Sequence, residues 1–226
     1  MVNRSQLVKL LCASALLILV SLMHLGAAET NTVRVALVFD DGPFPEHTPK
    51  LLDLFATEKI HVSFSVVASN VATHASAAKA IVAAGHELNN HSYSHRHAKD
   101  CTDAELEHQI GGAQKIISDV TGVTPRWYWP PFLEVDDRVR AAVAKAKLEV
   151  FSLKQVVVSQ DYDHSVSAAE IKRKATTNVK DGSVILFHEW RVETYEQLPA
   201  ILAELRRQGC VFLTFTELAE YNRTKK

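Results

Sequence analysis

Short apolar runs rich in β-branched residues alternate with helical patterns along most of this 226-residue chain. The first apolar run, Val33–Phe39, is typical of a buried strand, and the helical pattern Thr48–Glu58 follows it. Further strands are expected at Val62–Val67, Leu148–Leu153, Ser183–Phe187 and Val211–Phe215. Further helices are expected at Ala75–Ala84, Asp103–Val120, Val135–Lys147, Ala168–Val179, Thr194–Gln208 and Thr216–Tyr221. This alternation predicts one α/β domain built on a parallel sheet, either doubly wound or closed into a barrel.

Polar clusters stand directly after four of the apolar segments. They are Asp40-Asp41-Gly42-Pro43 after Phe39, Asn89 to His95 after Leu88, Pro130-Pro131-Phe132 after Trp129, and His188-Glu189-Trp190 after Phe187. In both parallel architectures, functional side chains gather at the carboxyl ends of the strands. We therefore expect the two Asp and three His of these clusters to share one site.

Asp41, His91 and His95 form a set of one carboxylate and two imidazoles, which is typical of a catalytic metal site. The two His are four residues apart, so their imidazoles can converge on one ion in a helical or tightly turned loop, and the three ligands leave positions open for water. Taken separately, each part has another interpretation. The adjacent Asp40 and Asp41 suit a turn before the prolines, and a His pair suits an exposed surface. His97 is expected to be a solvated loop residue.

Three segments resemble a known family. Val38-Phe39-Asp40-Asp41-Gly42-Pro43 resembles the first motif of the polysaccharide deacetylases, carbohydrate esterase family 4. His91-Ser92-Tyr93-Ser94-His95 is similar to their second motif, and Ile185-Leu186-Phe187-His188 is similar to their fifth. The resemblance covers the chain from about Val33 to Tyr221. It implies a deformed (β/α) barrel of parallel strands in a single domain. It also implies removal of acetyl groups from an N-acetylated or O-acetylated polysaccharide, such as peptidoglycan or chitin oligomers.

The resemblance further implies the ligands and the base of this reaction. Asp41, His91 and His95 would hold a divalent metal ion, zinc in most members of the family. The metal would polarise the acetyl carbonyl and activate water, and Asp40 would be the general base that takes the proton of that water.

Three further functional groups follow from the same resemblance. His188 would protonate the leaving amine, and Asp161 would orient and charge this His. The backbone N–H of Phe132, in the third motif, would help to hold the oxyanion. Tyr162, after Asp161, stands where the family usually has Trp.

The third motif departs from the family pattern of Arg-Pro-Pro-aromatic-Gly. Trp129 stands at the position of the Arg that tethers the base, and Leu133 stands at the position of the Gly. We expect Trp129 to form an aromatic wall for a sugar ring, while bound metal keeps Asp40 ionised. Arg126 would lie on the opposite strand face, so Arg191 is the next candidate partner for the base.

The first 28 residues have the pattern of a secretory signal peptide. A basic start precedes an apolar run of 14 residues, Leu10–Met23, and Gly26 and Ala28 suit the positions before a cleavage site. The expected organisation is a signal peptide at 1–28 and one catalytic domain at 29–226, with the protein secreted or periplasmic. An uncleaved membrane anchor is the alternative, although the run is shorter than the ~20 residues of a spanning helix.

Cys101 and Cys210 would be exposed to an oxidising compartment after export. We predict that they do not pair. Cys101 is expected near the catalytic rim, whereas Cys210 opens a strand at the opposite end of the barrel, and a disulfide needs Cα atoms within about 7 Å.

The charges of the chain are nearly balanced, with 25 Lys and Arg against 26 Asp and Glu. This balance argues against a nucleic-acid-binding protein. We expect an acetylated glycan as partner, no stable membrane insertion after cleavage, and a monomer. Two other functions stay open: a deacetylase-like protein that binds glycan with little or no turnover, and a phosphoryl-transfer enzyme, although such enzymes commonly space their two Asp by one residue. Residues 156–165 fall outside the simple pattern and are a candidate lining of the substrate groove.

Overall fold

The computed structural model describes residues 32–225, so the expected signal peptide at 1–28 lies outside the described residues. The described chain forms one eight-stranded sheet in the order β5-β4-β3-β2-β1-β7-β6, with β8 paired to β1 beside this path. Every strand pairing is parallel. The strands are β1 (Val33–Asp40), β2 (Ser63–Val66), β3 (Glu87–Asn90), β4 (Trp127–Tyr128), β5 (Glu149–Val150), β6 (Val156–Val158), β7 (Ser183–His188) and β8 (Cys210–Leu213).

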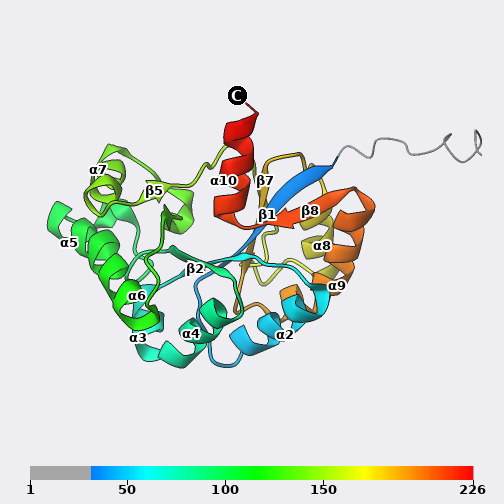
Figure 1. Cartoon of the computed structure of the whole chain (residues 1–226), viewed down its shortest axis with the longest axis horizontal. Coiled ribbons are helices and arrows are strands. Elements are labelled where there is room, and N and C mark those ends of the chain that lie inside the picture. The colour runs from blue at the N-terminus through cyan, green and yellow to red at the C-terminus, as the bar shows by residue number, and fades with distance from the viewer. Residues whose placement is uncertain (1–31, 226) are drawn as a thin grey trace, which may run out of the picture. The chain divides into compact units, whose positions relative to one another are not determined.

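Helices surround this curved sheet (Figure 1). They are α2 (Thr48–Glu58), α3 (Ala68–Thr73), α4 (Ala75–Ala83), α5 (Asp103–Glu107), α6 (Ala113–Thr121), α7 (Asp137–Lys145), α8 (Ala168–Thr176), α9 (Val192–Arg207) and α10 (Phe215–Thr224). The two ends of the sheet, β5 and β6, do not pair with each other within residues 32–225. The architecture is therefore an incomplete barrel, which confirms the expected deformed barrel of parallel strands.

The core has two sides because side chains of a strand alternate between the faces of a sheet. Val35, Leu37 and Phe39 of β1 pack outward in the cluster under the helices. Ala36 and Val38 point to the barrel interior, where the buried members of the cluster also include Trp127, Trp129, Phe151, Val184, Leu186, Phe215 and Leu218. The α10 helix thus contributes to the interior, and its Phe215 stacks on the ring of Phe151 with centroids 4.0 Å apart.

Several observed elements differ from those expected. The short strands β4 and β5 have two residues each, too few for a periodic pattern to define their bounds. The α3 helix was not expected, and β6 lies in the stretch 156–165 that the pattern left unassigned. The expected helix Asp103–Val120 is present as α5 and α6, with a π-helical segment, His108–Gly112, between them.

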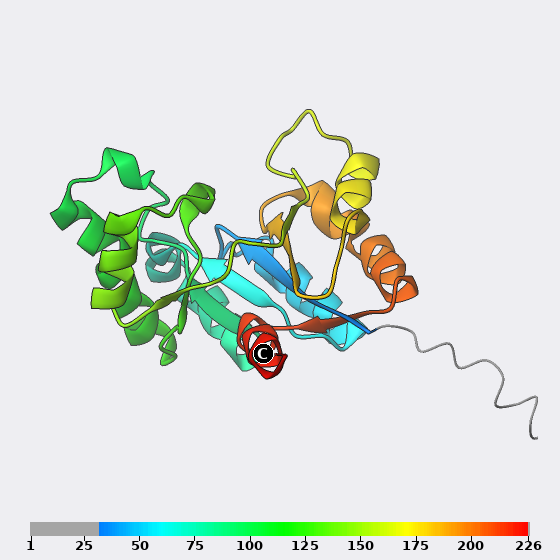
Figure 2. The same cartoon turned by 90° about the horizontal axis from the view of Figure 1, so that it is seen from above.

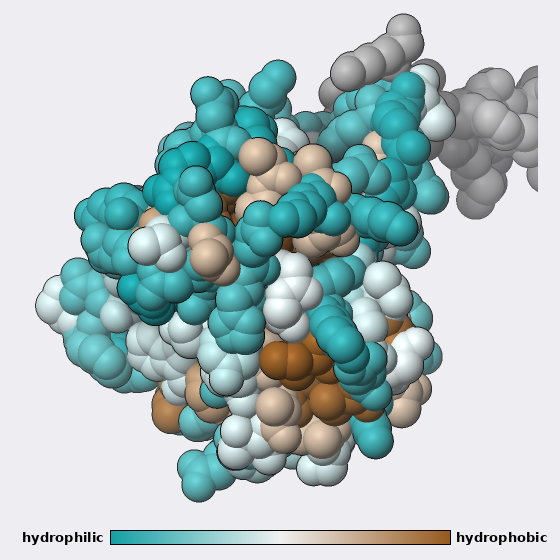
Figure 3. Space-filling view, turned by 90° about the vertical axis from the view of Figure 1, so that its left-hand side faces the viewer, coloured by the Kyte–Doolittle hydropathy of each residue, from teal (hydrophilic) through white to brown (hydrophobic). Residues whose placement is uncertain are grey.

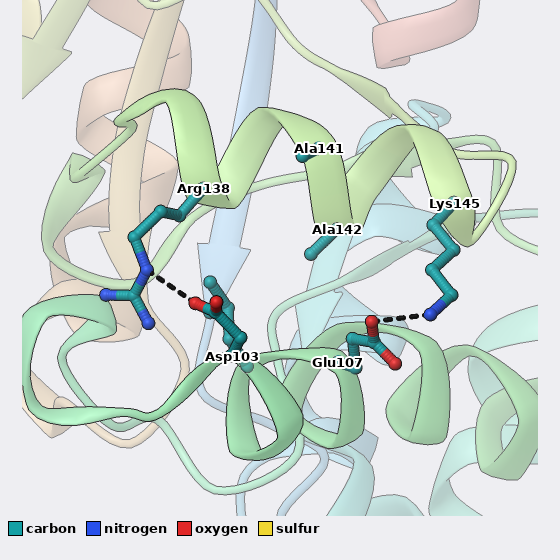
Figure 4. A pocket seen from close by; sticks show the side chains of 7 residues that line it. Asp103, Glu107, Arg138, Ala141, Ala142 and Lys145 are labelled. Carbon is teal, nitrogen blue, oxygen red and sulfur yellow. Dashed lines mark hydrogen bonds and ion pairs between the residues drawn. The ribbon is translucent and has the colours of Figure 1, made fainter.

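The α5 and α7 helices run side by side on one flank of the molecule and are joined by two ion pairs (Figure 4). Arg138 Nε lies 2.8 Å from Asp103 Oδ1, and Lys145 Nζ lies 2.5 Å from Glu107 Oε1. These pairs bridge a shallow pocket. Figure 3 shows the surface of this flank, which is mostly hydrophilic. The strongly hydrophobic residues in this view gather mainly in one area at the lower right. Because the two ion pairs between α5 and α7 are exposed, each contributes at most about 1 kcal/mol to the free energy of unfolding.

None of the helices within residues 32–225 has the length and apolar composition needed to cross a membrane. Cys101 and Cys210 are both buried, and neither forms a disulfide within the described residues 32–225. Cys210 is aligned with Val33 at the start of β1, whereas Cys101 follows the loop after β3. The predicted separation of the two Cys is confirmed.

Candidate metal centre and active site

The alternation of β1 and β7 places the two central groups of the site. Val38 and Leu186 belong to the interior cluster, so Asp40 and His188, two residues further along their strands, also point inward. Asp40 and His188 are aligned neighbours in the register of the two strands. The expected base and acid therefore lie side by side at the carboxyl edge of the sheet.

Asp41, His91 and His95 converge next to Asp40, whose Oδ2 lies 3.8 Å from His91 Nε2. Their ligand atoms all lie within 4.8 Å of one another. Asp41 Oδ1 is 3.6 Å from His91 Nε2 and 3.3 Å from His95 Nε2. This oxygen is buried and has no hydrogen-bond partner among residues 32–225. A cation between the three groups would satisfy it, so the residues fit a divalent metal ion.

The ligand loops hold the imidazoles in a state suited to metal binding. His91 Nδ1 lies 2.6 Å from the backbone carbonyl of Trp129 and donates its proton there, which leaves Nε2 free to bind a metal. Burial lowers the pKa of His91 and of His95, because it disfavours the charged imidazole. The N–H of His95 donates to Ser92 Oγ at 2.9 Å.

Left-handed backbone conformations recur in these loops. Asp41, Ser92, His95, Phe132 and Leu133 all have φ between 56° and 76°. Non-glycine residues rarely take this conformation, and at functional sites it re-aims a side chain at a local energetic cost. Leu133 has φ 57°, which gives a physical reason why the related family usually has Gly at its position.

Trp129 binds the expected base directly. Its indole Nε1–H donates to Asp40 Oδ2 at 2.9 Å. The Trp129 side chain is fully buried, so the expectation that it forms a wall for a sugar ring is wrong. The reason is packing: Trp129 lies in the interior cluster, where its ring centroid is 5.2 Å from that of Phe215 in α10. A neutral indole donor thus occupies the place of the usual cationic tether.

Neither of the two Arg considered as substitutes contacts the base. Arg126 lies on the other strand face, as expected, and pairs with Glu149 at 2.8 Å. Arg191 is buried, but its guanidinium bonds to His164 and to the carbonyl of Val166, and it pairs with Glu193. Arg191 therefore anchors the loop before α8, which projects beyond the helices in Figure 2, and the proposal that it tethers Asp40 is wrong.

Asp40 is 3% exposed, and its environment sets its proton affinity. Burial raises the pKa of Asp40 well above its ordinary value, while nearby His188 and the Trp129 N–H act in the opposite direction. Its second oxygen, Oδ1, is buried without a hydrogen-bond partner in the described part of the chain. This oxygen is available to accept a proton.

His188 and Asp161 form the expected pair. His188 Nδ1 lies 2.7 Å from Asp161 Oδ1, and Asp161 Oδ2 accepts from the His188 N–H at 2.8 Å and from Thr194 Oγ1 at 2.6 Å. Although burial lowers it, the hydrogen bond and charge of Asp161, together with Asp40 and Asp41, raise the pKa of His188 to about 9. His188 is therefore protonated at neutral pH and can act as an acid.

Asp40, Asp41, His95 and His188 line one cavity of about 510 Å³. Phe132 and Tyr162 lie on its rim, with 48% and 50% of their surfaces exposed. The Phe132 ring stacks on His97 with centroids 3.5 Å apart, so His97 packs against the site and is not simply solvated. The lining residues are Asp40, Asp41, His95, Pro130, Phe132, Leu133, Val158, Tyr162, Leu186, His188 and Trp190. Val158 and Tyr162 belong to the stretch 156–165, so that stretch does line the cavity.

Two residues after His188 were missed by sequence reasoning. Trp190 lines the cavity and donates its indole Nε1–H to Asp41 Oδ2 at 2.8 Å. Glu189 is fully buried, and its Oε1 accepts from Thr48 Oγ1 and from the N–H of Phe44. Burial raises the pKa of Glu189 to about 7. A Cβ at Gly42 would lie 1.7 Å from Glu189 Oε2, so the Gly of the Asp-Asp-Gly-Pro segment is needed for this contact.

Comparisons with known proteins agree with the geometry. A family model described as polysaccharide deacetylase matches residues 27–151. The peptidoglycan-N-acetylglucosamine deacetylase PgdA of Listeria monocytogenes is 29% identical over 84% of this chain, which spans 40% of that protein. A peptidoglycan-N-acetylglucosamine deacetylase of Bacillus cereus is 29% identical over 84% of this chain and 90% of its own length. The structure of peptidoglycan deacetylase PdaC from Bacillus subtilis superposes with a TM-score of 0.78 at 28% identity, covering 87% of this chain and 94% of the other.

Proposed function

The chain belongs to the polysaccharide deacetylase family, and we propose that it is a metal-dependent hydrolase of acetylated polysaccharides. The substrate class is an N-acetylated or O-acetylated glycan such as peptidoglycan or chitin oligomers. One observation carries the proposal: Asp40 lies between two groups, the cluster of Asp41, His91 and His95 and the pair of His188 and Asp161, and each group contributes residues to the cavity that Asp40 lines. Peptidoglycan is favoured by the names of the relatives that cover most of the chain.

Asp41, His91 and His95 are the residues that would hold the metal, and two imidazoles with one carboxylate suit zinc. When bound, the ion supplies Lewis-acid activation of the acetyl carbonyl and of a water molecule. The neutral state of the two imidazoles, which burial favours, is the state that binds metal.

The other residues of the site move the protons. Asp40 takes a proton from water through Oδ1, while the water oxygen forms a bond to the acetyl carbonyl carbon. The backbone N–H of Phe132, at the mouth of the cavity, stabilises negative charge on the carbonyl oxygen. His188 then donates its proton to the leaving nitrogen as the C–N bond breaks. The products are acetate and a free amino sugar. For an O-acetyl substrate the same proton goes to the leaving oxygen.

Export completes the proposed function. The basic start, the short apolar run and the small residues before Ala28 are the pattern of a cleaved signal peptide. A secreted or periplasmic location would bring residues 29–226 to a cell-wall or extracellular glycan.

The test is acetate release by purified protein loaded with zinc. We expect release from at least one of three polymers, peptidoglycan, chitin oligomers and acetylated xylan, and loss of release when a chelator removes the metal. His188→Ala is the matched control, because it removes the acid and leaves the three metal ligands intact. A zinc-loaded protein that binds glycan but releases no acetate from any of the polymers would contradict the proposal and favour a glycan-binding protein without turnover.

A further inference from the structure

The Asp40-Asp41 pair is held by two indole groups from different loops. Trp129, after β4, donates to Asp40 Oδ2 at 2.9 Å. Trp190, after β7, donates to Asp41 Oδ2 at 2.8 Å. In each carboxylate the other oxygen, Oδ1, is buried and has no hydrogen-bond partner within residues 32–225. One oxygen of each Asp is therefore fixed, and the other is left for chemistry.

The free oxygen of Asp41 faces the metal ligands. Oδ1 lies 3.6 Å from His91 Nε2 and 3.3 Å from His95 Nε2, while Oδ2 is on the side of the Trp190 indole. The terminal torsion of an Asp side chain is broad and roughly two-fold, so the backbone alone does not select which way the carboxylate plane turns. A hydrogen bond to one oxygen selects one plane and directs the other oxygen to the ion.

We propose that Trp190 is a positioning residue for metal binding: its indole N–H fixes the Asp41 carboxylate so that Oδ1 is presented to the ion. The inference rests on the proposed function, because it assigns the metal to Asp41, His91 and His95. Outer partners of this kind typically contribute 10–100-fold to metal affinity or activity.

The position of Trp190 itself is set by its surroundings. The preceding Glu189 is fully buried, and its backbone N–H donates to the carbonyl of Asp40 at 3.1 Å. The Trp190 ring lies between His164 and His188, with centroids 5.6 Å and 5.7 Å away. The donor is thus carried on a segment anchored to the end of β1, next to the residue that it orients.

A role of Trp190 as a wall for the substrate is the competing explanation, since the residue lines the cavity. The two roles use different parts of the side chain. A wall needs the ring face, whereas positioning of Asp41 needs the N–H. Trp190→Phe keeps a ring and removes the donor. A variant with benzothienylalanine at position 190 keeps the bicyclic shape and replaces the N–H with sulfur.

The chain provides a matched control in Trp127. Its indole Nε1–H also donates to a side chain, Thr216 Oγ1, at 2.9 Å, but this contact involves none of the metal ligands. Trp127→Phe removes an indole hydrogen bond of similar length without touching the site. We expect it to keep the metal affinity of the parent protein.

The experiment measures the dissociation constant for zinc by competition with a chromophoric chelator, and the visible absorption spectrum of the cobalt-loaded protein. In Trp190→Phe and in the benzothienylalanine variant, we expect the dissociation constant for zinc to rise by about 10-fold or more and the cobalt spectrum to change. Trp127→Phe should match the parent in both. Equal zinc affinity in the parent and the benzothienylalanine variant would overturn the inference. A parent that binds zinc and releases acetate, with all variants equal in metal affinity, refutes only the role of Trp190. A parent that binds no zinc refutes the proposed function itself.

Discussion

At the scale of single residues, the proposed base, Asp40, is held by a neutral donor where the family usually has a cation. The Trp129 N–H bonds to Asp40 Oδ2 at 2.9 Å, and its backbone carbonyl accepts from His91 Nδ1 at 2.6 Å. One residue therefore holds both the proposed base and a proposed metal ligand. A dipole stabilises a buried carboxylate less than a guanidinium does, and Asp40 accordingly depends on the indole and on nearby positive charge to stay ionised.

Replacing Trp129 with Phe removes the indole donor and keeps the backbone carbonyl. Because the Trp129 N–H lowers the pKa of Asp40, its loss should raise that pKa. The base must be ionised to act, so the acidic limb of the profile of kcat/KM against pH should move to higher pH. The profile is measured at saturating zinc, with metal content checked at each pH. An acidic limb that coincides with that of the parent would show that this hydrogen bond does not set the state of the base.

Replacing Asp161 with Asn tests the acid. The hydrogen bond and charge of Asp161 are the main causes that raise the pKa of His188 to about 9, with smaller contributions from Asp40 and Asp41, and His188 donates a proton only in its charged form. In Asp161→Asn the pKa of His188 should fall, so the alkaline limb of kcat/KM moves to lower pH and kcat at neutral pH falls by roughly tenfold or more. Thermal unfolding of the variant is the control for folding. An unchanged alkaline limb would assign that limb to another group.

The residues that sequence could predict are those in contiguous motifs at strand ends. The two Asp, the two ligand His and His188 lie together as expected, because parallel strands bring their carboxyl ends to one edge. Trp190 and Glu189 were missed because an indole and a carboxyl have no fixed role in a pattern. The signal that could have found them was their place directly after His188. The expectation for Trp129 was wrong because its ring is covered by Phe215 of α10, a long-range contact that no local pattern records.

At the scale of elements, the least predictable feature is the π-helical segment His108–Gly112 between α5 and α6. Apolar spacing predicted one uninterrupted helix. In the structure, the wider π-helical turn directs Gln109 toward the loop that carries His91 and His95. There Gln109 Oε1 accepts from the Ser94 N–H at 3.0 Å, and Gln109 Nε2 donates to Ser94 Oγ at 2.8 Å. Such π-bulges are frequent at functional sites.

Replacing Gln109 with Leu should loosen the loop that carries His95. The variant removes both hydrogen bonds to Ser94, and because Ser94 is exposed, water can replace them, so the loss of stability should be only about 0.5–1.5 kcal/mol per bond. We also expect weaker zinc binding, because the loop sets the position of His95. Gln109→Glu is the matched variant, since a carboxylate accepts from the Ser94 N–H as Gln109 does and can accept from the Ser94 hydroxyl once that group turns to donate, and it should recover much of the affinity. Zinc competition titration and thermal unfolding measure the two effects. Equal zinc affinity in the parent and in Gln109→Leu would limit Gln109 to a role in stability.

At the scale of the whole molecule, strand and helix alternation predicted a parallel sheet but could not choose between a doubly wound sheet and a barrel. Periodicity records which side of an element is buried and does not record the order of strands. The observed order, with β1 between β7 on one edge and β2 and β8 on the other, follows from long-range pairing. The choice of a deformed barrel came from the family resemblance, and the structure confirms it.

The central claim is that adjacent carboxylates divide two tasks, with Asp40 as base and Asp41 as metal ligand. The most direct test compares Asp40→Asn with Asp41→Asn for zinc content after dialysis and for acetate release. The account predicts that Asp40→Asn keeps about one zinc per chain and loses most turnover, since a general base contributes roughly 10²–10⁴-fold. It predicts that Asp41→Asn loses both zinc and turnover. Normal zinc content in Asp41→Asn, or loss of zinc in Asp40→Asn, would contradict the division of roles.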